Sequence, residues 1–470
     1  MPSILKRTLN ESIIYSLDPI IQRLIGFFLL PLYTAYLTPA DYGNLEYIIT
    51  ISSFLILITG GGLQTAFFKY GYKESEAIRR KALFNCIIAN ISISLIILLL
   101  AIFLKQYIFD NNTIALLFVI YLIGALIKQI FRYNLLVLRY KHKPGKYIIL
   151  TISAFLLTVL LNILFIVHYG FGYKGIIYAF IISNISIFLG FSPLLIKELS
   201  FSIDRNYIKK LLSFGLPMIP GNIAAMIMNI ADRIILKNYA GEEELGLYSY
   251  GYKFAILVNV LIINSFRLGW GPYKWDVYKL KDAKEIFRKY FYLYSNALII
   301  IIFFGNAILY YLGAIIPSNP KFAEGLKVLP IVIPSFFFLG IAQFQTLGVL
   351  FKNKTFLVSV AFIIAGIINI SLNLFLIPQY GMMGAALATI ISYFFHFIFS
   401  YFFNQKQYRI PYRINNLIIL ISLAFFMPVS TYLFRTYHSN DLTFFNLVII
   451  LPVIILAAIV FYPYLQNKTK

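Results

Sequence analysis

The sequence predicts an all-α polytopic membrane protein with about fourteen transmembrane helices, and three observations lead to this fold class. Apolar residues make up 60% of the 470 residues and charged residues only 12%, with a mean hydropathy of +0.81. Apolar runs of about 20 residues recur along the chain, and a helix of that length spans the hydrocarbon core of a bilayer. Lys and Arg gather in every second loop between these runs, as is typical of multi-pass proteins.

The apolar runs are predicted to be helices, because backbone amide groups within a bilayer must be hydrogen-bonded inside their own segment. A transmembrane β-barrel would instead show segments of alternating polarity, which this sequence does not have. Short turns with Gly and Pro, at 38–43 and 378–381, separate neighbouring helices. In chain order, we expect helices at 11–36, 44–68, 80–104, 113–138, 147–168, 174–196, 208–238, 245–270, 288–312, 327–351, 355–377, 382–404, 414–435 and 442–464.

The distribution of Lys and Arg predicts how the chain is oriented. The termini and one set of alternate loops hold 28 Lys and Arg residues, whereas the other set of loops holds 6. Because Lys and Arg are retained on the cytoplasmic side of a membrane, we expect both termini in the cytoplasm and an even number of spans. The same excess accounts for most of the formal net charge of +22, so we expect no nucleic-acid partner.

An internal repeat divides the chain into two halves. Residues 161–170 align with residues 372–381 at a shift of 211, and five of the ten positions are identical. Further matches at or near this shift pair Lys141 with Lys352, Lys143 with Lys354, Gly175 with Gly384, Ala179 with Ala388 and Ser183 with Ser392. Six spans separate the copies, so the halves are parallel, and such repeats hold the substrate between them near the midplane. We therefore expect two parallel six-helix lobes, at 1–200 and 201–405, and two additional helices at 406–470.

Charged residues inside the predicted spans are the candidates for function. A charge at the bilayer centre costs about 2.5–3.5 kcal/mol on insertion scales and normally faces a cavity or a partner. Helical spacing places most of these residues on polar stripes, which we expect to line a wet, cationic central cavity. The candidate substrate-binding residues are Arg23, Lys253, Arg267, Arg233, Lys128, Arg132, Asn222, Asn229, Asn264 and Tyr252. The candidates for ion coupling are Asp18 and Asp232.

Several of these charges have a structural alternative. Lys128, Arg132 and Arg267 lie near predicted helix ends, where long basic side chains can reach the interface without lining a cavity. Asp232 is adjacent to Arg233, and the two could form a structural ion pair rather than a functional one. The sequence leaves both interpretations open.

The sequence predicts a secondary transporter rather than an enzyme. The four His residues are dispersed without the spacing of metal ligands, and the sequence has neither a phosphate-binding loop nor a nucleophile elbow. We therefore expect no catalytic residues, no metal site and no cofactor. Transport would be driven by an H⁺ or Na⁺ gradient or by the substrate's own concentration difference.

Motifs in both halves resemble those of a known family. They are Thr-Pro-Ala-Asp-Tyr-Gly at 38–43, Gly-Gly-Gly-Leu at 60–63, Ala-Asp-Arg-Ile-Ile-Leu at 231–236, Glu-Leu-Gly-Leu-Tyr-Ser at 244–249, and Tyr-Lys at 252–253. Together these motifs resemble the Wzx-type oligosaccharide flippases of the multidrug/oligosaccharidyl-lipid/polysaccharide (MOP) exporter superfamily. The resemblance covers essentially the whole chain.

The resemblance implies a MATE-like bundle of two lobes in the bacterial cytoplasmic (inner) membrane. It implies alternating-access movement of an undecaprenyl-diphosphate-linked oligosaccharide, the repeat unit of an O-antigen or capsule, from the cytoplasmic to the periplasmic leaflet. Cationic residues of helices one and eight, matched in position by Arg23 and by Lys253 or Arg267, would contact the diphosphate. The partners would be the lipid bilayer and other membrane proteins of polysaccharide assembly.

Three other functions stay open at this point. A lipid II flippase would carry a closely similar substrate. A MATE-type cation or drug antiporter should have an acidic cavity, whereas basic residues outnumber acidic ones inside these spans. A membrane glycosyltransferase or O-antigen polymerase usually carries catalytic residues in substantial external loops, and the external loops expected here are all short.

Overall fold

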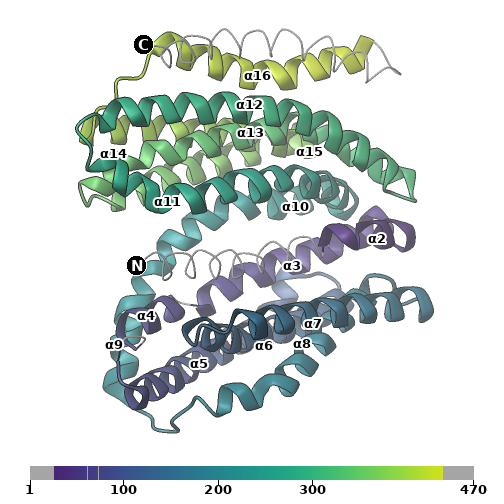
Figure 1. The fold of residues 1–470 in the computed structure, drawn as a ribbon. Helices are drawn as coiled ribbons and strands as arrows, with labels where there is room; N and C mark the ends of the chain where they lie inside the picture. Colours follow the sequence, from purple (N-terminus) through teal and green to yellow (C-terminus); the bar gives the residue numbers. More distant parts are fainter. Residues whose placement is uncertain (1–25, 61, 72–73, 438–470) are drawn as a thin grey trace. The chain divides into compact units, whose positions relative to one another are not determined.

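The computed structural model describes residues 26–60, 62–71 and 74–437, and this part of the chain consists of helices joined by short loops (Figure 1). Nine of its helices are long and apolar enough to cross a membrane, and one of them, Phe356–Gln407, covers two of the expected spans. The predicted fold class, an all-α polytopic membrane protein, is confirmed. The expected span at 442–464 and most of the span at 11–36 lie outside the described residues.

The helices form two compact units, Met1–Met226 and Ile227–Lys470. In the first unit a capping box begins α3. Asp41 Oδ2 accepts hydrogen bonds from the Thr38 N–H at 3.2 Å and from the Thr38 hydroxyl at 2.8 Å. Thr38 Oγ1 in turn accepts a hydrogen bond from the Asp41 N–H at 3.1 Å. The central helix is α6, which packs against α3, α5, α7 and α8. The helices of this unit are α2 (Leu30–Tyr36), α3 (Pro39–Gly60), α4 (Leu63–Tyr70), α5 (Glu76–Ile108), α6 (Asn112–Tyr140), α7 (Pro144–Ile163), η1 (Leu164–His168), α8 (Gly172–Ile196), α9 (Arg205–Gly215) and η2 (Leu216–Met218).

The second unit is built around α13, whose residues are nearly all apolar and buried. This helix packs against α12, α15 and α16. The first helix, α10, begins before the boundary between the units. The helices are α10 (Ile219–Val258), η3 (Asn259–Ile263), α11 (Asn264–Tyr278), α12 (Ala283–Ile315), η4 (Pro320–Val328), α13 (Leu329–Ala342), η5 (Gln343–Thr346), α14 (Leu347–Phe351), α15 (Phe356–Gln407) and α16 (Ile414–Tyr437).

Helix α10 consists of two arms that meet at Gly241. The backbone of Gly241 is not helical, with φ of 83° and ψ of −178°. In a straight helix residues 232 and 248 would lie about 24 Å apart, yet the Tyr248 hydroxyl donates a hydrogen bond to Asp232 Oδ2 at 2.5 Å. The chain therefore turns back at Gly241, between the spans expected at 208–238 and 245–270.

The two turns of the internal repeat both place a glycine at positive φ. Gly170 and Gly381, which the shift of 211 residues superposes, both have positive φ, at 65° and 52°, a region that favours glycine. Gly381 lies inside α15, and the rings of Phe362 and His396 from the two arms of this helix stack with centroids 4.0 Å apart. Both turns thus end one span and reverse the chain into the next.

A second pair of repeat glycines allows the two arms at each turn to pack closely. A Cβ on Gly175 would meet the carbonyl carbon of Phe165 at 3.2 Å, and one on Gly384 would meet the carbonyl carbon of Leu376 at 2.6 Å. Phe165 and Leu376 are themselves equivalent at the shift of 211. The match between the two sequence segments therefore corresponds to a shared structural unit.

Helix α9 is a separate element that the sequence prediction merged into the span at 208–238. It packs against α4 and α5 in the first unit, where Leu211 is fully buried. The boundary between the two compact units falls at 226/227, after α9, and the division into six-helix lobes at 200/201 stays a prediction. Helix α9 belongs to the first unit because it is amphipathic: one face of α9 carries apolar residues that complete the core of the first unit.

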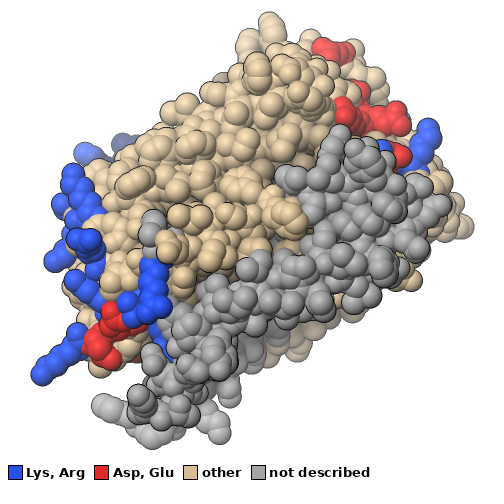
Figure 2. All heavy atoms as spheres, turned by 90° about the horizontal axis from the view of Figure 1, so that it is seen from above, with Lys and Arg blue, Asp and Glu red and all other residues tan. Residues whose placement is uncertain are grey.

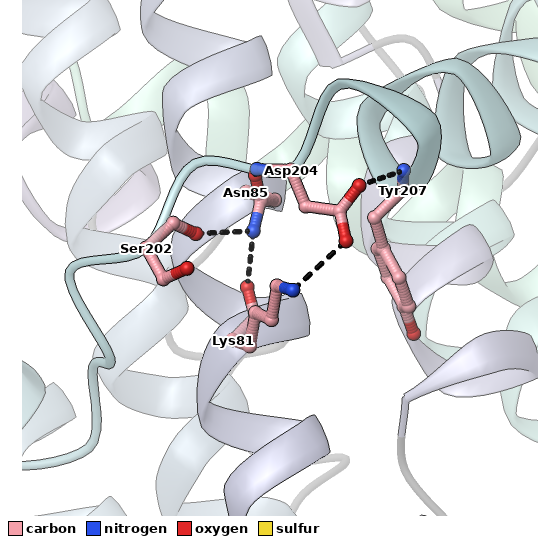
Figure 3. A network of polar contacts seen from close by, with 5 residues as sticks. All are labelled: Lys81, Asn85, Ser202, Asp204 and Tyr207. Carbon is pink, nitrogen blue, oxygen red and sulfur yellow. Dashed lines mark hydrogen bonds and ion pairs between the residues drawn. The ribbon is translucent and has the colours of Figure 1, made fainter.

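The segment before α9 is held against α5 by a polar network (Figure 3). Asn85 Nδ2 donates to the carbonyl of Ser202 at 2.9 Å, and Asn85 Oδ1 accepts from the Asp204 N–H at 2.8 Å. Asp204 forms an ion pair with Lys81 at 2.9 Å and accepts a hydrogen bond from the Tyr207 N–H at 3.1 Å, which caps the start of α9. The hydrogen bond from Lys81 is the main cause that holds the pKa of Asp204 below its ordinary value.

Charged side chains lie mainly at the ends of the helices. Figure 2 shows most Lys and Arg side chains gathered at one end and a long uncharged surface between the two ends. This distribution fits a protein whose helices cross an apolar layer.

Candidate functional site

A pocket of about 190 Å³ lies inside the first unit, between α3, α6 and α8. Helix α6 supplies most of its wall, because positions 121, 125, 128, 129 and 132 share one face of the helix. The residues that line the pocket are Ser53, Ile56, Tyr121, Ala125, Lys128, Gln129, Arg132 and Phe180. The structure thus brings Lys128 and Arg132 together in one pocket. The sequence had also allowed both side chains to extend to the membrane interface instead of lining a cavity.

The pocket combines positive charge with flat aromatic walls. Tyr121 and Phe180 stack with ring centroids 4.3 Å apart and an interplanar angle of 12°, and Lys128 Nζ lies 5.6 Å from the centroid of Phe180. Among the described lining residues, two are cationic and none is acidic. Such a pocket suits an anionic ligand that also has apolar faces, because Lys and Arg bind phosphate oxygens by charge-assisted hydrogen bonds.

Hydrogen bonds behind the pocket fix one of its polar side chains. Thr59 Oγ1 donates to Gln129 Oε1 at 2.5 Å, and the Thr59 carbonyl accepts from Asn90 Nδ2 at 3.0 Å. All three side chains are buried. Residues of α3, α5 and α6 are therefore joined directly behind the site, which limits the motion of its wall.

The second unit contains a buried polar cluster around Asp232. Its Oδ2 accepts the hydrogen bond from Tyr248, and its Oδ1 lies 3.9 Å from Nη1 of Arg233. The Arg233 guanidinium lies over the ring of Tyr252, 4.7 Å from its centroid, and Tyr252 also exchanges a hydrogen bond with Tyr393. These contacts fit a structural ion pair between Asp232 and Arg233, one of the two interpretations that the sequence allowed. Ion coupling by Asp232 stays a prediction.

Four other candidates have described side chains, and they lie on α10 and α11. Lys253 follows Tyr252 in α10 and is half-buried, and Asn264 is half-buried at the start of α11. Arg267 and Asn222 are exposed. Asn229 lies on α10 with no described side chain, and Arg23 and Asp18 lie outside the described residues. The expected cavity between the lobes stays a prediction.

Sequence analysis missed four polar or aromatic residues of the pocket. Tyr121 and Gln129 share the helical face of Lys128, so the spacing that grouped the two cations could also have found them. Ser53 and Phe180 come from α3 and α8. No periodicity of the sequence connects them to α6, because only helix packing brings them there.

A family profile described as "Polysaccharide biosynthesis protein" matches residues 8–273, more than half of the chain. The chain belongs to this polysaccharide biosynthesis protein family. A curated membrane protein of Methanocaldococcus jannaschii is 25% identical over 239 residues, which cover 48% of the chain and 45% of the relative. The Lsg locus protein 1 of Haemophilus influenzae is 24% identical over 285 residues, which cover 58% of the chain and 68% of the relative. The chain thus spans less than half of the first relative's length.

Solved structures of the MOP superfamily share the fold. The lipid II flippase MurJ, in an inward closed conformation, has a TM-score of 0.67 at 17% identity, over 97% of this chain and 100% of MurJ. An inward-facing multidrug resistance MATE transporter has a TM-score of 0.56 at 15% identity, over 82% of this chain and 94% of that one. A MOP superfamily transporter from Pyrococcus furiosus has a TM-score of 0.55 at 17% identity, over 85% and 95% of the two chains. Family and fold together identify a multi-pass membrane protein with the architecture of MOP-type transporters and flippases.

Proposed function

We propose that the protein is a flippase that moves an undecaprenyl-diphosphate-linked oligosaccharide from the cytoplasmic to the periplasmic leaflet of the bacterial inner membrane. The observation that carries this proposal is the pocket in which Lys128 and Arg132 lie beside the stacked rings of Tyr121 and Phe180. The polysaccharide biosynthesis family supports it independently. In the proposed orientation, both termini and the Lys- and Arg-rich loops face the cytoplasm.

The chemistry of the pocket matches the chemistry of that substrate. A diphosphate carries negative charge that must be neutralised inside the membrane, and hydrogen bonds to charged groups are each worth about 1.5–3 kcal/mol. Aromatic rings provide flat apolar surfaces for the C–H faces of sugars, and Gln129 provides an amide for their hydroxyl groups. The polyprenyl tail can remain in the surrounding lipid.

The proposal extends to residues outside the pocket. Arg23, Lys253 and Arg267 would contact the diphosphate at other stages of transport, and Asn222, Asn229, Asn264 and Tyr252 would contact sugars. Asp18 or Asp232 would couple transport to an H⁺ or Na⁺ gradient. Other membrane proteins of polysaccharide assembly would receive the product.

Two related functions differ in their substrate. MurJ, which shares the fold, is a lipid II flippase, and a lipid diphosphate with a sugar headgroup would fit the same pocket. A cationic drug, in contrast, would be repelled by Lys128 and Arg132. The assay should therefore compare these three ligands.

The test is flipping in proteoliposomes that contain the full-length protein and a fluorescent undecaprenyl-diphosphate oligosaccharide. The double substitution Lys128→Gln and Arg132→Gln should lower the flipping rate at least tenfold, because it removes both cations while keeping polar side chains of similar length. Lys146→Gln is the matched control, since Lys146 is an exposed lysine of α7 outside the pocket, and it should leave the rate unchanged.

Three results would contradict the proposal. Wild-type rates in the double variant would remove the pocket from the pathway. Transport of lipid II at a far higher rate than the oligosaccharide would reassign the substrate. Uptake of a cationic dye without any lipid flipping would favour the drug antiporter.

A further inference from the structure

One end of the first unit carries a surface on which basic side chains lie over aromatic rings. It is formed by Lys69 and Tyr70 at the end of α4 and by Lys210 and Phe214 of α9, and we call these four residues the α4–α9 patch. Both lysines are exposed to solvent. Neither α4 nor α9 takes part in the pocket described above.

Both lysines of the patch lie against the ring of Tyr70. Lys69 Nζ lies 5.1 Å and Lys210 Nζ lies 4.5 Å from the centroid of Tyr70. Lys69 Nζ also lies 4.0 Å from the centroid of Phe214, whose ring meets that of Tyr70 edge to face at 5.7 Å. Cation–π contacts favour these positions, but an aromatic ring does not neutralise the charge of an ammonium group.

Three other basic residues of this unit are neutralised by carboxylates. Lys81 pairs with Asp204 at 2.9 Å, and Arg80 pairs with Glu76 at 2.8 Å. Lys141 pairs with Glu198. Within the described part of the chain, neither Lys69 nor Lys210 forms an ion pair, so the patch presents two positive charges at one ring that no carboxylate neutralises.

The rigidity of α9 keeps the patch in place. The Tyr207 hydroxyl donates a hydrogen bond to the Tyr70 carbonyl at 2.6 Å, which joins α9 directly to the end of α4. Asp204 caps the start of α9 and pairs with Lys81 (Figure 3). Leu211 anchors the apolar face of the helix in the core. A ligand that binds the two lysines therefore needs to order little of the protein.

We propose that the α4–α9 patch binds the headgroup of an anionic phospholipid at the membrane surface. The patch lies at the end of the apolar segment Pro39–Tyr70, which is long enough to span a membrane, and α9 lies outside the membrane-spanning helices with its apolar face on the core of the same unit. Aromatic side chains favour this same depth, and lysines near it are attracted by the negative surface of the membrane. A lipid phosphate between Lys69 and Lys210 would balance their charges, and its acyl chains would extend toward the apolar helices of the unit.

The experiment is a titration of the purified full-length protein in neutral detergent, with bound lipids counted by native mass spectrometry. Phosphatidylglycerol is the anionic probe and phosphatidylcholine the neutral one. Lys69→Gln combined with Lys210→Gln should weaken phosphatidylglycerol binding roughly 25-fold, because each lysine near an anionic surface contributes about fivefold in affinity. Phosphatidylcholine binding should not change.

Two controls separate this site from general electrostatic attraction and from misfolding. Lys209→Gln removes the charge of an exposed lysine of α9 that does not belong to the α4–α9 patch. This variant should change the affinity for phosphatidylglycerol less than twofold. Lys69→Arg with Lys210→Arg keeps both charges and should restore binding to within threefold of wild type. The proposal is overturned if the double Gln variant binds normally, if Lys209→Gln loses as much affinity, or if millimolar inorganic phosphate displaces the lipid.

Discussion

The repeat glycines Gly170 and Gly381 allow a quantitative comparison, because both have positive φ but differ in their surroundings. A Cβ on Gly170 would meet nothing within 4 Å, whereas one on Gly381 would overlap the carboxylate of Glu244. That carboxylate accepts a hydrogen bond from the Met382 N–H at 3.1 Å, at the start of the second arm of α15. The carboxylate would have to move, and this hydrogen bond would be lost.

The expected costs follow from these two situations. The left-handed conformation costs a residue with a Cβ about 1–2 kcal/mol, so Gly170→Ala should destabilise the protein by about 1.5 kcal/mol. Gly381 has a ψ of −132°, outside the αL region, so Gly381→Ala carries at least this strain. It also loses a hydrogen bond to a charged group, for which we take the lower value of about 1.5 kcal/mol because Glu244 is half-exposed. The total is at least about 3 kcal/mol.

The assay is unfolding in mixed detergent micelles titrated with sodium dodecyl sulfate, which yields free energies of unfolding. Gly190→Ala is the control, because Gly190 lies in α8 with a negative φ and open space around it. Alanine should stabilise the helix there by about 0.5–1 kcal/mol.

A double-mutant cycle isolates the contact with Glu244. In a Glu244→Ala background the hydrogen bond is already lost, so Gly381→Ala should cost only the backbone strain and about 1.5 kcal/mol less than in the wild-type background. Equal destabilisation by Gly170→Ala and Gly381→Ala in the wild-type background, or full additivity in the cycle, would refute the reasoning.

Two further predictions concern hydrogen bonds to carboxylates. Tyr248→Phe removes the hydroxyl that donates to buried Asp232 and should lower the free energy of unfolding by about 2 kcal/mol. In Tyr250→Phe, the lost hydroxyl donates to the neutral Gly313 carbonyl at 2.7 Å, so the loss should be about 1 kcal/mol. Equal losses in the same unfolding assay would argue against a charged Asp232. Asp204→Asn should keep the cap of α9 but lose the ion pair with Lys81, so hydrogen exchange at 204–208 should be faster than in wild type and slower than in Asp204→Ala. The pKa of Asp204 lies below its ordinary value of 3.8. The stability that its carboxylate contributes is therefore complete above pH 3.8 and is lost as the pH falls through the lowered pKa. Hydrogen exchange that accelerates already between pH 7 and 5, after correction for the intrinsic exchange rate, would contradict this assignment.

Much of the architecture follows from the sequence because the bilayer imposes local rules. The expected spans at 80–104 and 113–138 correspond to α5 and α6, since apolar length alone decides whether a helix can cross. The turn at 378–381 contains Gly381, and the shift of 211 residues led to the equivalent Gly170, because only glycine adopts their conformation without strain. The shared face of Lys128 and Arg132 likewise follows from helical spacing alone.

The tertiary structure decided which residues meet across helices. Only packing brings Phe180 of α8 over Tyr121 of α6, and only the turn at Gly241 places Tyr248 on Asp232. Packing likewise assigned α9 to the first unit, although hydropathy joined it to the following span. Hydropathy and helical period describe one segment at a time, whereas contacts between helices depend on the shapes of both surfaces. The sequence by itself therefore determined which segments are long and apolar enough to cross a membrane, and the packing of the helices decided which side chains meet in the pocket and in the polar networks.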